Sequence, residues 1–220
     1  RRFEKVTGDV VVDYLHGNGR IGVLVAGVGA NDDAAKEALK NVAMQIAAMN
    51  PQYISRSDIS ADSMAKLKEI TVDSALNAPD TLPKPILNKL IAKAVDGVWS
   101  AEDVAIYEEK KSNMNFLFNF LSKEAKAQLA ELAIADKDAI VADKIFSGLV
   151  EGRISKQVKE ISLLDQVYVK AEDGKQTVAK YLESVNKSLS IAKFVRFEVG
   201  EGMEKKNEDF AAEVAKQMNV

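Results

Sequence analysis

Two parts of the chain, near its opposite ends, have the composition of β-strands and constrain the fold most. Residues 191–199 (IAKFVRFEV) alternate apolar and charged side chains from Val195 onward, which is typical of a strand with one buried face. Two more β-rich runs, 10–16 and 21–27, lie near the start. Because a two-stranded hairpin alone is marginal in water, we expect all three runs to form one sheet.

Gly17-Asn18-Gly19-Arg20 separates the first two runs. Asn-Gly is the favoured pair for the type I′ turn that joins antiparallel strands. The same residues, with Gly22, match the dinucleotide-binding pattern G-x-G-x-x-G, but that pattern must follow a strand and open a helix. Since a second β-rich run follows here, we interpret these residues as a hairpin.

Helical patterns fill most of the remaining chain. Over residues 33–49, apolar side chains recur every three or four positions, and Asn31 or Asp32 can cap this helix. Ser60, Ser100 and Ser122 are further candidate caps. Helices are predicted over 61–77, 86–95, 101–120, 123–134, 136–162 and 177–185, and a strand over 163–170.

This order of elements predicts an α+β protein: a small antiparallel sheet with helices packed on one face, interrupted by a long helical hairpin or insertion. The sheet needs both ends of the chain, because its strands flank the helical excursion. We expect the first part of a core over 1–56, a helical hairpin with an extra insertion over 57–162, the second part of the core over 163–204, and a C-terminal helix module over 205–220.

Composition argues against several function classes. The chain has no cysteine and one histidine, His16, so thiolate and multi-histidine metal sites and a His–His acid/base pair are excluded. A net charge of −3 argues against nucleic-acid binding, which needs a concentrated basic face. We find neither an apolar run long enough to span a membrane nor a signal peptide. We therefore expect no catalytic residues, no metal and no cofactor.

Apolar residues of the middle helices have two interpretations. They form either a partner-binding stripe or the core of a small helical subdomain, and the second is favoured because helices joined by short loops must bury their apolar faces. The residues concerned are Trp99, Met114, Leu117, Phe118, Leu121, Leu129 and Leu132.

Four blocks, in order, resemble the bacterial elongation factor Ts family. They are His16-Gly17 with RIGVLV at 20–25, AMQIAA at 43–48 where the family has AMHIAA, VEGR at 150–153, and RFEVGEG at 196–202 followed by DFAAEVA at 209–215. The likeness covers residues 1–59 and 146–220. Part of the range 82–145 looks additional to the family.

The resemblance implies a guanine-nucleotide exchange factor for elongation factor Tu, acting in the cytoplasm by protein–protein binding and not as an enzyme. The family's TDFV motif, which disturbs the partner's Mg²⁺ and phosphate region, does not occur in this sequence, and neither does its ubiquitin-associated-like N-terminal domain. We therefore expect a fragment that lacks the N-terminal domain and the first half of the core, and that binds elongation factor Tu but exchanges nucleotide poorly.

The resemblance also implies partner-binding residues. His16, with Gly17 beside it, and Val169-Lys170 match residues that line an apolar depression for a helix of the partner, and Phe210 in the last helix offers a separate anchor. Lys170 replaces the family's Met, and Val167-Tyr168 replaces its usual Pro-Phe. The alternative function is a scaffold or dimerisation module, with a homodimer formed through the helical arm.

Overall fold

The structure is a computed structural model and describes residues 2–202, except for the side chain of Asn115. It divides into two compact units. The sheet unit contains the described residues up to Asn50 and from Val167 onward, and the helical unit contains Pro51–Gln166. The predicted C-terminal helix module, with Phe210, lies outside the described residues.

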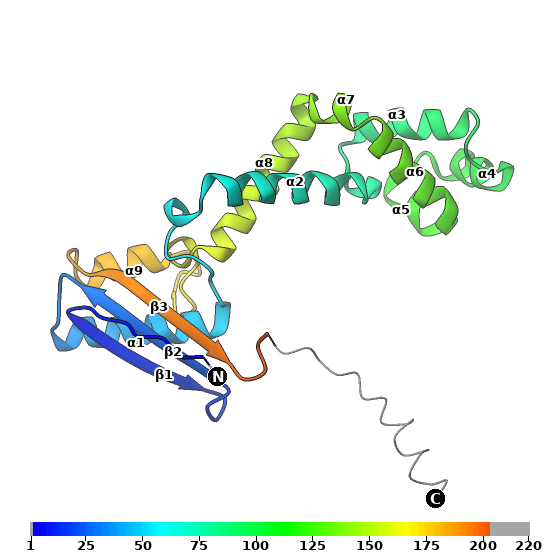
Figure 1. The fold of residues 1–220 in the computed structure, drawn as a ribbon. Coiled ribbons are helices and arrows are strands. Elements are labelled where there is room, and N and C mark those ends of the chain that lie inside the picture. The colour runs from blue at the N-terminus through cyan, green and yellow to red at the C-terminus, as the bar shows by residue number, and fades with distance from the viewer. Residues whose placement is uncertain (1, 203–220) are drawn as a thin grey trace, which may run out of the picture. The chain divides into compact units, whose positions relative to one another are not determined.

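Three antiparallel strands form the sheet, in the order β1 (Val10–His16), β2 (Ile21–Val28) and β3 (Ser190–Glu198) (Figure 1). Strand β2 is central. Its Ile21 pairs with His16 of β1, and its Val25 pairs with Phe194 of β3. The predicted pairing of the first hairpin with the distant third strand is therefore confirmed.

The turn between β1 and β2 has the predicted geometry. Asn18 and Gly19 both have positive φ, 53° and 83°, and the Arg20 N–H donates to the Gly17 carbonyl at 3.1 Å. Positive φ at both central residues is the signature of a type I′ turn. Since β2 and not a helix follows, the glycine pattern belongs to a hairpin.

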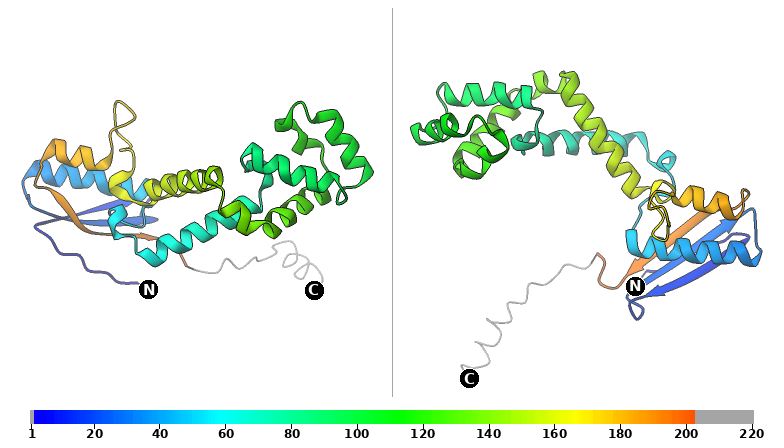
Figure 2. Two further views of the ribbon diagram at one scale, coloured as in Figure 1. Left: turned by 90° about the horizontal axis from the view of Figure 1, so that it is seen from above. Right: turned by 180° about the vertical axis from the view of Figure 1, so that it is seen from behind.

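Helices α1 (Asp33–Met49) and α9 (Val178–Val185) cover one face of this sheet (Figures 1 and 2). Asp32 caps α1 by accepting a hydrogen bond from the Ala35 N–H at 2.8 Å. Ala35, Ala38, Leu39, Val42 and Ile46 of the apolar stripe are fully buried, and α1 packs on β1 and β2. The fold is thus α+β with helices on one face, as predicted.

The helical unit carries the other helices. They are α2 (Ala61–Leu76), α3 (Lys84–Val95), α4 (Ala101–Lys110), α5 (Met114–Phe120), α6 (Lys123–Ala135), α7 (Lys137–Val141) and α8 (Lys144–Ile161), with 3₁₀ turns at Arg56–Asp58, Pro79–Thr81 and Leu163–Asp165. Ser60, Ser100 and Ser122 each accept a hydrogen bond from a backbone N–H of the first helical turn, so the three predicted caps are confirmed. None of the helices described is long and apolar enough to span a membrane.

Two predicted helices are each broken in two. The single helix expected over 101–120 ends at Lys110, and α5 begins at Met114, because Ser112 and Asn113 between them favour turns over helix interiors. The single helix expected over 136–162 is interrupted at Asp143. The Asp143 carboxylate accepts hydrogen bonds from the N–H groups of Ile145 and Phe146 and so starts a new helix.

The prediction of a strand over 163–170 is wrong. Leu163–Asp165 is a 3₁₀ turn, and the backbone N–H groups of Leu163 and Leu164 donate to the carbonyls of Tyr53 and Ile54, both at 2.9 Å. Beyond it, Val167 makes only an isolated bridge with Thr177. The segment is rich in residues that favour strands, but none of the three strands of the sheet pairs with it.

The middle helices bury the side chains whose role the sequence left open. Trp99, Leu117, Leu121 and Leu129 belong to one buried cluster, and Met114, Phe118 and Leu132 pack against it. The Trp99 indole donates to the Ala125 carbonyl at 3.1 Å. The favoured interpretation, a helical core, is confirmed for these residues.

A buried carboxylate connects two helix starts in this core. Asp103 accepts hydrogen bonds from the Ser122 N–H and hydroxyl, both at 2.9 Å, and from the Ser100 hydroxyl at 2.8 Å. Burial raises the pKa of Asp103, but these bonds outweigh it, and the net pKa lies below the ordinary value. A depressed pKa means that the folded state favours the ionised form, so the stabilisation is present above the unfolded-state pKa and is lost as pH falls through the folded-state value.

We predict that Asp103→Asn lowers the free energy of unfolding of the helical unit at neutral pH by about 2 kcal/mol, since charged hydrogen bonds are replaced by neutral ones. Urea unfolding followed by fluorescence of Trp99, the single tryptophan, measures this. The loss should shrink as pH falls below about 4, the ordinary pKa of an aspartate, because the unfolded state then binds the proton first and the stabilisation by the charge disappears. A difference that stays constant down to pH 2.5 would contradict this role for the charge.

Candidate partner-binding surface

His16 and Gly17 lie where β1 enters its turn. His16 is the last residue of β1, Gly17 has φ of 59°, and both are exposed. The Tyr14 hydroxyl, two residues earlier on the same strand, is 3.1 Å from His16 Nδ1. The turn geometry and this contact fix an exposed imidazole at one end of the sheet.

Val169 is held in place by a buried glutamine of α1. Gln45 is fully buried, its Nε2 donates to the Val167 carbonyl at 3.0 Å, and its Oε1 accepts from the Val169 N–H at 2.8 Å. A side-chain amide has the same donor and acceptor as a peptide group. Gln45 therefore gives the segment 167–169 the hydrogen bonds that a neighbouring strand would have given.

Side chains alternate along this extended segment. Tyr168 is 5% exposed and stacks on Tyr181 of α9, with ring centroids 4.1 Å apart and planes within 14°. Burial, followed by the hydrogen bond to Tyr181, raises the pKa of Tyr168, so the phenol stays neutral at physiological pH. Val169 points the other way and is 49% exposed, which leaves an apolar side chain on a fixed backbone.

Lys170 is also tied to α1. Its ammonium donates to Asn41 Oδ1 at 2.7 Å, while the Asn41 amide donates to the Tyr181 hydroxyl at 2.8 Å. Asn41 and Gln45 are four residues apart, so they lie on the same side of the helix. Lys170 therefore adds a charge next to Val169, and its position is set by Asn41.

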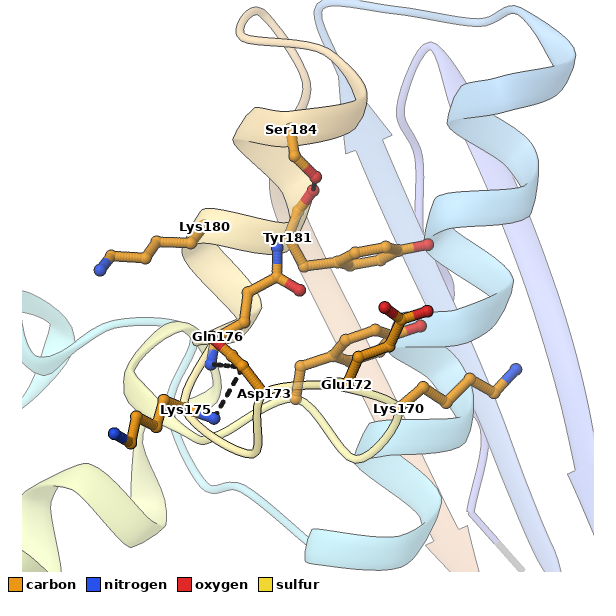
Figure 3. Close-up of a pocket in the computed structure, with 9 residues that line it drawn as sticks. Lys170, Glu172, Asp173, Lys175, Gln176, Lys180, Tyr181 and Ser184 are labelled. Atoms are coloured by element: carbon orange, nitrogen blue, oxygen red, sulfur yellow. Dashed lines mark hydrogen bonds between the residues drawn. The ribbon is translucent and has the colours of Figure 1, made fainter.

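An open cavity of about 830 Å³ adjoins this segment. Figure 3 shows that Lys175 and Lys180 extend away from it on one side and Lys170 on the other. Asp173 accepts hydrogen bonds from the N–H groups of Lys175 and Gln176, both at 2.8 Å, and these bonds lower its pKa. The lysine charges diverge, so the cavity does not gather them around a small anionic ligand.

The residues expected at the surface form two pairs, and a different part of the sheet unit holds each pair in place. His16 and Gly17 are fixed by β1 and its turn, and Val169 and Lys170 by α1. Within residues 2–202, we find no cluster of three or more His, Asp or Glu side chains arranged to hold a metal ion. The sequence interpretation missed Gln45 and Asn41, although a signal was present: Gln45 is a polar residue between apolar Val42 and Ile46 in a stripe that must be buried.

We predict that Gln45→Leu frees the segment 167–169 and lowers stability by about 2 kcal/mol, because the part-buried Val169 N–H and Val167 carbonyl lose their partners. Hydrogen exchange of the Val169 amide, measured by NMR, should accelerate strongly. Asn41→Ala is the matched control: it removes the contacts to Lys170 and Tyr181 but leaves both bonds of Gln45, so the Val169 amide should stay protected.

Equal exchange rates at Val169 in Gln45→Leu and the wild type would show that this amide is protected by something other than Gln45. Loss of protection in Asn41→Ala as large as in Gln45→Leu would show that the side-chain contacts, and not the backbone bonds, hold the segment.

Comparison with known proteins shows one family throughout. The family model described as "Elongation factor TS" matches residues 1–111 and 112–201. Elongation factor Ts of Clostridioides difficile is 35% identical over 222 residues, covering 99% of this chain and 53% of the relative. That of Clostridium novyi is 34% identical over 226 residues (100% and 53%), and that of Halothermothrix orenii 34% over 220 residues (100% and 52%).

The chain therefore spans about half the length of the curated relatives it matches. The matches continue through residues 82–145, which the four sequence blocks do not cover.

Proposed function

The chain belongs to the elongation factor Ts family, and from that premise we propose that it acts in translation elongation, in the cytoplasm, by binding elongation factor Tu and taking part in its guanine-nucleotide exchange. The observation that carries the proposal is similarity to curated elongation factors Ts over the whole described chain. The proposed mode of action is binding between proteins, without bond-making chemistry or a cofactor.

An exchange factor acts through differential affinity. It must bind its nucleotide-free partner more tightly than the GDP-bound one, and linkage then requires that it weakens GDP binding by the same factor. What such a protein needs is a surface with a fixed shape, because a surface already ordered before binding loses less conformational entropy on association.

The sheet unit offers a surface of this kind. We assign partner contacts to His16, Gly17, Val169 and Lys170, and a further one to Phe210, outside the described residues. Val169 is half exposed on a backbone fixed by Gln45, and His16 is exposed beside a type I′ turn. A few well-placed side chains usually carry most of the affinity of an interface.

We predict that the 220-residue chain binds elongation factor Tu and that Val169→Asp weakens binding by about tenfold or more, because a desolvated charge replaces an apolar contact. Val98→Asp is the matched control: it changes an exposed valine of the helical unit, which is 39% exposed, and should leave affinity unchanged. Isothermal titration calorimetry with GDP-bound and nucleotide-free partner measures both variants.

Release of fluorescent GDP should be accelerated little by the chain alone, because binding that does not distinguish the two partner states shifts no equilibrium and the TDFV motif is absent. Adding the TDFV-containing segment of a complete family member should restore release. Full acceleration by the chain alone would assign exchange to His16 and Val169. Absence of binding to either partner state would refute the proposed function.

A scaffold or dimerisation module is the second candidate, and one observation favours it. Helix α5 exposes Phe116 and Phe120, at 55% and 53%, four residues apart on one side of the helix. Light scattering separates the two functions. We expect a monomer, whereas a dimer that dissociates in the double variant Phe116→Ser/Phe120→Ser would favour the module.

A further inference from the structure

The chain's single histidine has a specific neighbour. Tyr14 and His16 are two residues apart on β1, so their side chains lie on the same face of the sheet. Their rings are 6.0 Å apart between centroids, and the Tyr14 hydroxyl is 3.1 Å from His16 Nδ1. This is a hydrogen bond to one identified ring nitrogen.

The bond restricts the imidazole. A neutral imidazole has one N–H donor and one acceptor nitrogen, and the contact made by one nitrogen decides which of them carries the proton. A phenol hydroxyl is protonated at neutral pH and is far more acidic than an imidazole N–H, so the stronger arrangement has the hydroxyl donating to Nδ1. The ring proton then resides on Nε2.

Two charged residues of β3 on the same face of the sheet as His16 bond to each other. In the sheet, Ile21 lies opposite His16, and Glu198 lies opposite Ile21. The Glu198 carboxylate accepts a hydrogen bond from Arg196 at 2.8 Å, and the Arg196 guanidinium also reaches the Ala47 carbonyl at 3.5 Å. Tyr14 is thus the group that engages Nδ1, and the exposed imidazole has Nε2 left for another molecule.

We propose that Tyr14 is a positioning residue that holds His16 in the tautomer protonated on Nε2, so that the surface presents an N–H donor and selects a hydrogen-bond acceptor on the partner, such as a carbonyl or carboxamide oxygen. The part played by the partner rests on the proposed function. The tautomer is a property of the free chain and can be measured without it.

The first experiment is a long-range ¹H–¹⁵N correlation spectrum of the ¹⁵N-labelled chain at about pH 8.5, well above the ordinary imidazole pKa. One histidine gives one unambiguous set of signals. The wild type should show a protonated Nε2 and an unprotonated Nδ1. In Tyr14→Phe, which loses only the hydroxyl, the signals should move toward the mixture of tautomers of a free imidazole.

The matched control is Tyr107→Phe, which removes a hydroxyl from the helical unit and should leave the imidazole signals unchanged. A wild-type Nδ1 that carries the proton, or a tautomer distribution identical in the wild type and Tyr14→Phe, would overturn the proposal. Neither outcome depends on elongation factor Tu.

The second experiment is a double-mutant cycle on binding to elongation factor Tu. Tyr14→Phe should weaken binding by about three- to tenfold, the value of one hydrogen bond, because the donor is no longer held in place. In the His16→Ala background, Tyr14→Phe should have no further effect. An equal loss in both backgrounds would mean that Tyr14 contacts the partner directly.

The proposed function and the inference about Tyr14 would fail in different ways. If the wild-type chain does not bind elongation factor Tu but the NMR signals behave as expected, the proposed function fails and the role of Tyr14 in setting the tautomer stands. If binding is normal but the tautomer does not respond to Tyr14→Phe, the function stands and this inference fails.

Discussion

Two hydrogen bonds of one buried side chain connect parts of the sheet unit that are far apart in sequence. Gln45 of α1 bonds the Val167 carbonyl and the Val169 N–H, at the point where the chain re-enters this unit after the helical excursion. An unpaired amide at such a depth would cost stability. The pairing of Gln45 with this segment therefore places Val169 on the surface and Tyr168 against α9.

The candidate surface combines two different ways of fixing a side chain. At His16, backbone geometry does so, since a turn with positive φ follows directly and Tyr14 holds the ring. At Val169, the side-chain amide of Gln45 on α1 does so, in place of a neighbouring strand. Both devices order the surface before a partner arrives, which suits the proposed function, in which affinity distinguishes two states of the partner.

Local sequence patterns predict much of the fold, and the incorrect predictions have one cause in common. The alternation from Val195, the Asn18-Gly19 pair and the stripe of α1 predict the sheet, its turn and its covering helix. The segment 163–170 has strand composition, but whether a strand forms depends on a partner that local sequence does not reveal, and here the partner is Gln45. Likewise, the exposure of Phe116 on α5 depends on which side of a short helix the core covers.

We propose that the sheet unit carries the partner-binding surface near His16 and Val169. Hydrogen-exchange mass spectrometry of the chain with and without nucleotide-free elongation factor Tu tests it most directly. We expect added protection in peptides that contain residues 14–20 and 167–171, with the helices between residues 101 and 135 unchanged. Protection confined to residues 101–135, with the His16 turn and the Val169 segment unaffected, would contradict it.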